Sequence, residues 1–352
     1  MFTRICIFCI FVNKNLMNKK LFSIRLHEAR VHCGYSLDKL VKVANLSITR
    51  QCLYRYEKGD MLPKQEVVVA LAKAFGVSKE YFLGGSLGID IPMLRSAKNY
   101  KLTVEEENRL TSRLCFWAER YLRMERETGC SVTFVNPIKP TIVRNLNDII
   151  CASDSLREAW RCGDGPIASV LRLLERKGIK ILDMPLPDGI FGLSTWADHT
   201  HPLIVLDLRP EKTTIERLRF TASHELAHLL LTFPTDSEWT AEKRCEKFAS
   251  FFLFPKKTFI EEMGNEHRSA LTLDELIDLK GIYGVSVQAM VHEAWDLRMI
   301  TREHYDWWYE ERIHKNWTEK GWGGYEFKEN VGREKRIESM AKENATQSDR
   351  NI

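Results

Sequence analysis

The stretch at residues 220–231, FTASHELAHLLL, constrains this sequence most, because it combines an apolar composition with His224-Glu225-Leu226-Ala227-His228. Residues four apart face the same side of an α-helix, about 6 Å apart along its axis. Two imidazoles in that arrangement can bind one Zn²⁺. Glu225, one residue along, would lie beside the open coordination position, where a carboxylate can accept a proton from water. The pattern therefore predicts a zinc-binding helix inside a folded domain.

The same stretch has a second interpretation, a core helix whose two histidines bind no metal. The HExxH pattern arises by chance in about a few per cent of chains of this composition. A core helix, however, would place two imidazoles and a carboxylate among apolar residues without partners, which is unfavourable. The metal interpretation is therefore favoured.

A third metal ligand is expected from the following helix, TAEKRCEKFASFFLFP, at residues 240–255. It offers Glu242 and Glu246, four residues apart and opposite a strongly apolar face. A solvated charged face is the other interpretation of this pair. His199 and His201 precede an expected strand and could reach the site, although ordinary surface histidines are the simpler interpretation.

The N-terminal part of the chain has the pattern of several short helices between residues 21 and 83. Ser36 is a good N-cap for a helix over 37–43. A turn at 45–49 is followed by a helix over 50–56, and Pro63 begins another that ends at Gly76. This segment predicts a compact all-α domain of five helices.

The rest of the chain alternates helices with a few strands. A long amphipathic helix is expected over 103–128 and shorter helices over 147–160 and 165–177, and strands are expected over 179–183, 191–196 and 203–207. Further helices are expected over 213–231, 240–254 and 271–310. The fold class is therefore α+β and mostly helical, with a small sheet beside the HExxH helix.

Composition restricts the environment of the protein. The net charge of +4 is too small to coat nucleic acid, so any DNA contact must come from a local patch. Nine cysteines, odd in number and scattered, are expected to be reduced thiols of a cytoplasmic protein. Residues 1–16 contain a lone CxxC and an apolar run shorter than the roughly 20 residues of a membrane span. They are interpreted as an apolar leader or a misassigned start, with translation beginning at Met17.

The sequence around the HExxH pattern resembles the ImmA/IrrE family of metallopeptidases. RLRFTASHELAHLLL followed by EKRCEKFASFFLFP carries the resemblance, and GPIASVLRLLERKGIKILDMPLP, FGLSTW, PLIVLDL and LIDLKGIYGVSVQAMVHEAWDLRMI extend it to about residues 150–300. The resemblance implies a zincin-like domain and a gluzincin-like zinc endopeptidase. It assigns His224, His228 and Glu242 as zinc ligands and Glu225 as the catalytic base. Glu246 departs from the family, which commonly has Asn or Asp there as a partner of the ligands, and this puts the tuning of catalysis in doubt.

Residues 21–83 resemble the XRE (Cro/C1-type) helix-turn-helix regulators, above all in RQCLYRYEKGDMLPKQEVVVALAKAFGVSKEYFLG. The second helix of such a motif enters the major groove of DNA with its N-terminal residues at base edges. By this resemblance, the base-reading positions are Thr49, Arg50, Gln51 and Tyr54, and the phosphate contacts include Arg55 and Lys58. The turn at Asn45-Leu46 is about two residues longer than usual, which leaves the register of recognition open. A domain used only for protein contacts is the alternative.

These inferences divide the chain into five segments: 1–16, the leader or misassigned start; 17–88, the helix-turn-helix domain; 89–145, a linker with a long helix; 146–312, the zinc peptidase domain; and 313–352, a charged and loosely ordered tail. The chain is expected to be a DNA-binding transcriptional regulator whose zinc endopeptidase domain cleaves a repressor or other partner protein, such as a toxin. Its expected partners are a double-stranded DNA operator, that protein and a second copy of itself, with no membrane. Two alternatives remain. One is a repressor or antitoxin whose peptidase-like domain is a structural or ligand-sensing module without catalytic turnover. The other is a general zinc peptidase whose N-terminal domain only binds protein.

Overall fold

The computed structural model describes residues 18–84, 89–90, 102–138, 141–234, 240–264 and 267–350. The predicted leader 1–16, the lone CxxC and the alternative start Met17 lie outside the described residues. The chain separates into an N-terminal unit, residues 1–90 and 98–124, and a C-terminal unit, residues 91–97 and 125–352.

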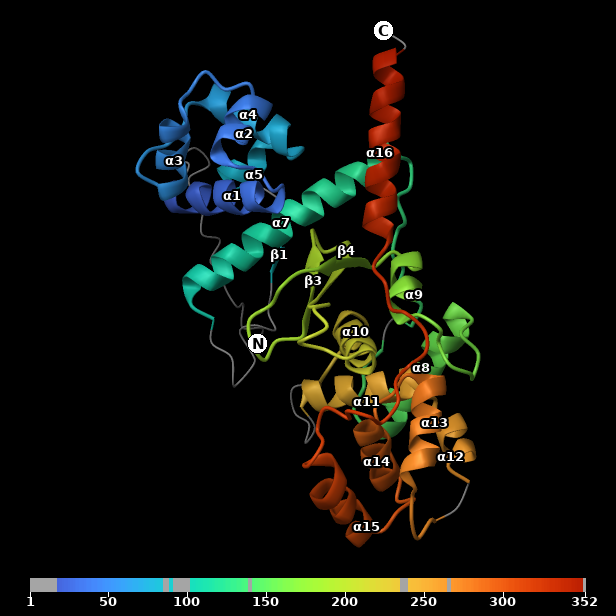
Figure 1. Cartoon of the computed structure of the whole chain (residues 1–352). Coiled ribbons are helices and arrows are strands. Elements are labelled where there is room, and N and C mark those ends of the chain that lie inside the picture. The colour runs from blue at the N-terminus through green and yellow to red at the C-terminus, as the bar shows by residue number, and fades with distance from the viewer. Residues whose placement is uncertain are drawn as a thin grey trace, which may run out of the picture. The chain divides into compact units, whose positions relative to one another are not determined.

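The N-terminal unit is a bundle of helices (Figure 1). Its elements are α1 Lys19–His32, α2 Leu37–Val43, α3 Arg50–Lys58, α4 Gln65–Phe75, α5 Lys79–Leu83, the two-residue strand β1 Ile89–Asp90 and most of α7 Val104–Glu127. The Ser36 side chain caps α2 by accepting from the Lys39 amide, as the sequence predicts. The turn before α3 is as long as expected, and Asn45 lies in the left-handed region at φ 47°, which asparagine tolerates.

The core of this unit differs from the prediction in one respect. The sequence predicts a linker over 89–145, whereas α7 contributes Cys115 and Phe116 to the same buried cluster as Phe75 and Tyr81. The ring of Phe116 lies 5.6 Å from that of Tyr81. The amphipathic pattern predicts the helix but not its partner, so the apolar face of α7 closes a core that the first five helices leave open.

The C-terminal unit is built around a small sheet and one central helix. Its first elements are α8 Leu146–Trp160, α9 Val170–Arg176, β2 Lys180–Asp183, β3 Gly192–Ala197, β4 His201–Leu206, α10 Ile215–Leu230 and α11 Ala241–Leu253. They are followed by α12 Lys256–Glu262, α13 Leu273–Tyr283, α14 Val287–Asp296, α15 Arg302–Trp307, the π-helix η1 Trp308–Ile313 and α16 Arg333–Arg350. None of the described helices combines the length and the apolar character that crossing a membrane requires.

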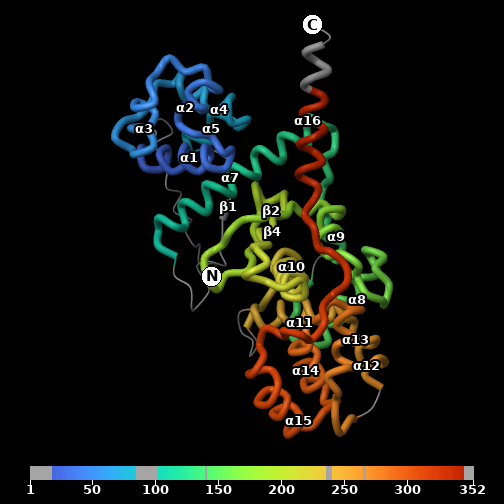
Figure 2. Tube along the Cα trace, in the orientation of Figure 1, coloured from blue at the N-terminus to red at the C-terminus, as the bar shows by residue number. Residues whose placement is uncertain are grey.

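The sheet of this unit packs against the HExxH helix. Strand β4 lies between β3 and β2, antiparallel to the first and parallel to the second. Helix α10 packs against β3 and β4 on one side and against α11 on the other, as the ribbon and the trace both show (Figures 1 and 2). Four of the six residues of β3 and all but the first residue of β4 are buried, so both faces of these strands are covered.

Two predictions for this unit need correction. The helix expected over 165–177 begins only at Val170, because Gly165-Pro166 interrupts it and Ser169 is its N-cap. The prediction of a loosely ordered tail over 313–352 is wrong for much of its length. Trp322 and Tyr325 are buried, the carboxylate of Glu329 is fully enclosed, and α16 follows. The small number of aliphatic residues suggested disorder, but aromatic rings and the buried ion pairs of Glu319 with Lys280 and of Glu329 with Arg219 anchor this segment.

Candidate metal centre and DNA-binding helix

Helix α10 places both HExxH histidines on one partly buried face. The side chain of Thr214 caps the helix, and Ala222, Leu226 and Ala227 pack into the core. His224 and His228 keep 14% and 11% of their side-chain surface exposed, so both rings are partly accessible from solvent. Their Nε2 atoms lie 3.2 Å apart and point at one place.

The first turn of α11 brings Glu242 to the same place. Its Oε2 lies 3.1 Å from Nε2 of His224, and its Oε1 lies 3.5 Å from Nε2 of His228. In a tetrahedral site with bonds of about 2.1 Å, neighbouring ligand atoms are about 3.4 Å apart. Two imidazole nitrogens and a carboxylate at 3.1–3.5 Å separations therefore match the edges of such a site. In the described part of the chain, these three residues form the group that could hold a metal ion.

Glu225 lies beside this cluster but is not part of it. Its side chain is buried, and Oε2 accepts a hydrogen bond from the Ser194 hydroxyl at 2.6 Å. Burial raises the pKa of Glu225, although the neighbouring His224 and His228 act in the opposite direction. The result is a basic carboxylate held in a fixed orientation. Sequence reasoning missed Ser194, because a serine within an apolar strand has no local signature.

The electrostatics of the cluster favour a cation. Hydrogen bonds from His224 and His228 hold the pKa of Glu242 well below its usual range. Burial acts to lower the pKa of His224, but the bond to Glu242 and the charges of Glu225, Glu242 and Glu246 raise it overall. Three carboxylates thus surround two imidazoles.

The other candidate ligands lie elsewhere. Glu246 is exposed one turn along α11 and acts on His224 through its charge. His199 lies in the turn between β3 and β4 at φ 56°, and His201 is the first residue of β4. Burial and the charge of Lys180 lower the pKa of His201. Neither histidine belongs to the metal cluster.

Helix α3 presents all the residues that the sequence predicts for DNA contact. Thr49, Arg50, Gln51, Tyr54, Arg55 and Lys58 are exposed. Leu53 and Tyr56 fix the opposite face in the core. The Thr49 hydroxyl caps the helix by accepting from the Cys52 amide. The Arg50 guanidinium lies 3.6 Å from the Asp38 carboxylate, and both side chains are open to solvent.

The charge of this face comes from α3 itself. The Lys58 ammonium lies 5.5 Å from the centre of the Tyr54 ring, which keeps a positive charge beside an exposed aromatic surface. A basic and aromatic helix face of this kind suits the major groove and its phosphates.

Comparisons with known proteins agree with this division. Residues 26–82 match the family model described as helix-turn-helix, and residues 174–294 match the one described as IrrE N-terminal-like domain. Among curated proteins, none matches the chain. One solved structure that matches is that of ComR from S. thermophilus in complex with DNA and its signalling peptide ComS. It is 14% identical and covers 84% of this chain and 81% of its own, with a TM-score of 0.17, which is too low to support an inference.

The two matches fall on the two structural units. The first covers α2 to α4, with the exposed face of α3, and the second covers β2 to β4, α10 and α11, with the metal cluster. The chain is a fusion of an XRE-type helix-turn-helix DNA-binding domain with a peptidase domain of the ImmA/IrrE family.

Proposed function

We propose that this protein is a transcriptional regulator that binds operator DNA through α3 and cleaves a partner protein at a zinc centre. The observation that carries the proposal is the convergence of His224, His228 and Glu242 beside the buried carboxylate of Glu225. A purely structural domain has no need for a basic carboxylate next to three side chains whose ligand atoms converge on one point. The expected substrate is a repressor or toxin, and the expected location is the cytoplasm.

His224, His228 and Glu242 would hold the zinc ion. A zinc ion there would polarise the scissile carbonyl and lower the pKa of a water to about 7. The two histidines and one glutamate form a ligand set that metallopeptidases use.

Glu225 is the proposed proton carrier. The Ser194 hydroxyl fixes Oε2, and within the described residues Oε1 has no hydrogen-bond donor. Oε1 is therefore the atom that takes the proton of the attacking water. The same carboxyl then gives the proton to the departing amine nitrogen as the peptide bond breaks. Its raised pKa suits this second step, because a more basic carboxylate holds the proton longer.

The contacts proposed for DNA are those on the exposed face of α3. Arg50 and Gln51 carry the chemistry that reads guanine and adenine edges, with Thr49 and Tyr54 beside them. Arg55 and Lys58 are proposed to contact phosphates. Pairing of two copies on two half-sites is expected of this class of DNA-binding domain.

Cleavage of a peptide library derived from a bacterial proteome tests the enzymatic part of the proposal. Zinc-loaded wild-type protein is compared with Glu225→Gln, and products are identified by mass spectrometry. We expect new termini that require Glu225 and disappear on chelation. Zinc-loaded protein that gives the same termini as Glu225→Gln would contradict peptidase activity. It would favour a repressor or antitoxin with a non-catalytic domain, an outcome that the Glu246 departure also favours.

A further inference from the structure

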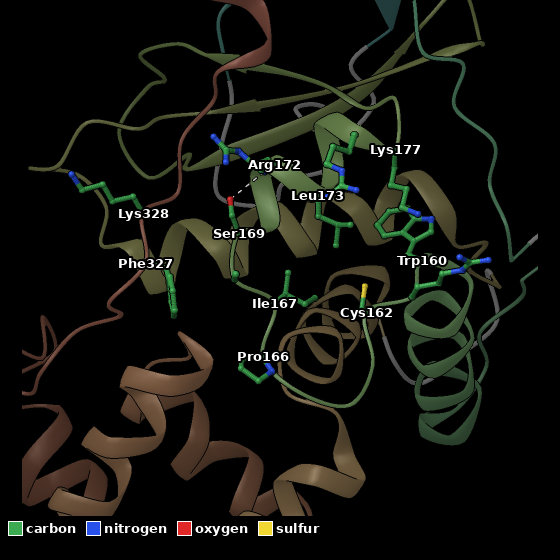
Figure 3. Close-up of a pocket in the computed structure, with 13 residues that line it drawn as sticks. Trp160, Cys162, Pro166, Ile167, Ser169, Arg172, Leu173, Lys177, Phe327 and Lys328 are labelled. Atoms are coloured by element: carbon green, nitrogen blue, oxygen red, sulfur yellow. Dashed lines mark hydrogen bonds between the residues drawn. The ribbon is translucent and has the colours of Figure 1, made fainter.

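A basic cavity lies in the C-terminal unit among residues that the metal cluster does not use. It has a volume of about 650 Å³ and is lined by the loop between α8 and α9, by α9 and by residues 327–328. Cavities that bind small molecules have volumes of roughly 300–1,000 Å³. Figure 3 shows Trp160 and Lys177 at one end and Phe327 and Lys328 at the other, with Ile167 and Ser169 between them.

The charged side chains around this cavity all have the same sign. Its lining holds no aspartate or glutamate, and its cations are Arg161, Arg172, Arg176, Lys177 and Lys328. Within the described part of the chain, none of these five has a carboxylate within ion-pair distance; Lys177 is half-buried and the other four are exposed. Cations gathered around a concave wall repel one another and concentrate anions.

The buried acidic residue next to Lys328 does not neutralise this charge. Glu329 follows Lys328, but its carboxylate accepts hydrogen bonds from Arg219 and from the amides of Val170 and Leu171. Its side chain is fully buried in those contacts. The positive charge of the cavity is therefore available to a ligand from outside.

Two aromatic rings give the cavity a second property. Trp160 lines one end and is only 7% exposed, with the Lys177 ammonium 5.6 Å from its ring centre. Phe327 lines the other end and is 52% exposed, in a unit that buries most of its large apolar side chains. An exposed ring beside exposed guanidinium groups suits a ligand that has both a flat ring and an anionic group.

The wall of the cavity is already formed. The carbonyl of Ile167 accepts hydrogen bonds from Arg219 at 2.8 Å and from the Tyr325 hydroxyl at 3.0 Å. The Tyr325 hydroxyl also lies 3.1 Å from the carbonyl of Ala168. A loop fixed by buried partners needs little rearrangement to bind a ligand.

We propose that this cavity binds a small phosphorylated ligand with a flat ring, the chemistry of a nucleotide. Arg172 and Arg176, one turn apart on the exposed side of α9, contact the phosphates, and Phe327 stacks on the ring. The site is independent of the metal cluster, and its ligand is bound whether or not the peptidase proposal holds.

Calorimetric titration of the full-length protein tests the site with three probes. ADP has both a ring and phosphates, pyrophosphate lacks the ring, and adenosine lacks the phosphates. The variant Arg172→Gln/Arg176→Gln removes two charges and keeps most of each side chain. Its control, Arg302→Gln/Lys315→Gln, removes the same charge from exposed positions outside the cavity. Phe327→Ala removes the exposed ring.

We expect one ADP per chain, bound more tightly than pyrophosphate, with adenosine weakest. The variant Arg172→Gln/Arg176→Gln should lower the affinity for ADP and for pyrophosphate at least tenfold. Its control should change neither affinity more than twofold. Phe327→Ala should lower the affinity for ADP severalfold and leave the affinity for pyrophosphate unchanged. Absence of ADP binding, or equal loss in the control, would overturn the site. Equal affinities for ADP and pyrophosphate, unaffected by Phe327→Ala, would overturn the assignment to a ring-bearing ligand.

Discussion

Ser194 and Glu225 form the shortest polar contact of the metal region, a buried hydrogen bond of 2.6 Å between a strand and the HExxH helix. The serine has no carboxylate partner other than Glu225 among the described residues. Its position on β3 is therefore explained by orienting that carboxylate. Ser194 is a positioning residue, because it acts on the reaction through Glu225.

Ser194→Ala should lower kcat for any peptide that the wild-type protein cleaves by about 10- to 100-fold, because a hydrogen bond to a charged group contributes about 1.5–3 kcal/mol. The zinc content and KM should stay close to wild type. Steady-state kinetics and metal analysis check both. Ser153→Ala is the control, since it removes a buried hydroxyl that has no hydrogen-bond partner among the described residues. A wild-type kcat in Ser194→Ala would contradict the role of the hydroxyl.

The exposed residues of α3 give a second prediction at this scale. An operator is first selected from random duplex DNA with the wild-type protein. Arg50→Ala and Gln51→Ala should then each cost about 1–3 kcal/mol of binding and relax the sequence preference. Lys58→Ala should weaken binding to all DNA sequences alike, and it should reduce the slope of log affinity against log salt concentration by about one.

Fluorescence anisotropy at several salt concentrations separates these two behaviours. Lys73→Ala, which removes an exposed charge from α4, is the matched control and should change little. Unchanged affinity in both Arg50→Ala and Gln51→Ala would contradict base reading by α3. It would favour an N-terminal domain that docks protein.

At the scale of elements, the close approach of β3 to α10 determines whether Ser194 reaches Glu225. Gly192 begins β3, and a Cβ atom there would lie 2.6 Å from Cγ2 of Thr221 on α10. The glycine is required by this contact, since its backbone is not in the left-handed region.

Gly192→Ala should lower the free energy of unfolding by about 1–3 kcal/mol, because the added methyl group forces the strand off the helix. Adding Thr221→Ser removes the clashing Cγ2 and should restore part of the loss. Chemical denaturation of the single and double variants measures this. The control is Gly165→Ala, where an added Cβ meets nothing within 4 Å. An unaltered stability in Gly192→Ala would show that this contact is looser than described.

The elements themselves could largely be predicted from the sequence. Helical periodicity and caps gave α2, α10 and α11 to within a few residues, and the sequence also predicted β2, β3 and β4 to within a few residues. The pairing of His224 with His228 followed from a spacing local to one helix, whereas the pair Glu242 and Glu246 stayed open until the family resemblance singled out Glu242. Ser194 could not be predicted, because its role depends on how β3 is placed against α10. The packing of α7 and of residues 322–329 could not be predicted either, because both depend on partners far away in the sequence.

At the scale of the whole molecule, the C-terminal segment completes the unit that contains the metal cluster. Glu329 pairs with the fully buried Arg219 of α10 at 2.6 Å and also accepts from Ser169 and the first amides of α9. The segment after η1 therefore joins the HExxH helix to α9.

Glu329→Gln should destabilise the C-terminal unit by about 3–5 kcal/mol, because it leaves the Arg219 charge buried without its partner. Glu326→Gln, a change at an exposed position three residues earlier, should have almost no effect. Thermal and denaturant unfolding compare the two variants with wild type. Equal stability of both variants would mean that the segment after η1 is not part of the folded unit.

The zinc content of the purified protein is the measurement that tests the central claim most directly. Wild type is compared with His228→Ala and Glu242→Ala, and Glu246→Gln is the control for loss of a carboxylate on α11 that is not a ligand. We predict one zinc ion per chain in wild type and in Glu246→Gln, and its loss in the other two variants. A wild-type protein without zinc after preparation with excess metal, or zinc retained in both ligand variants, would contradict the account.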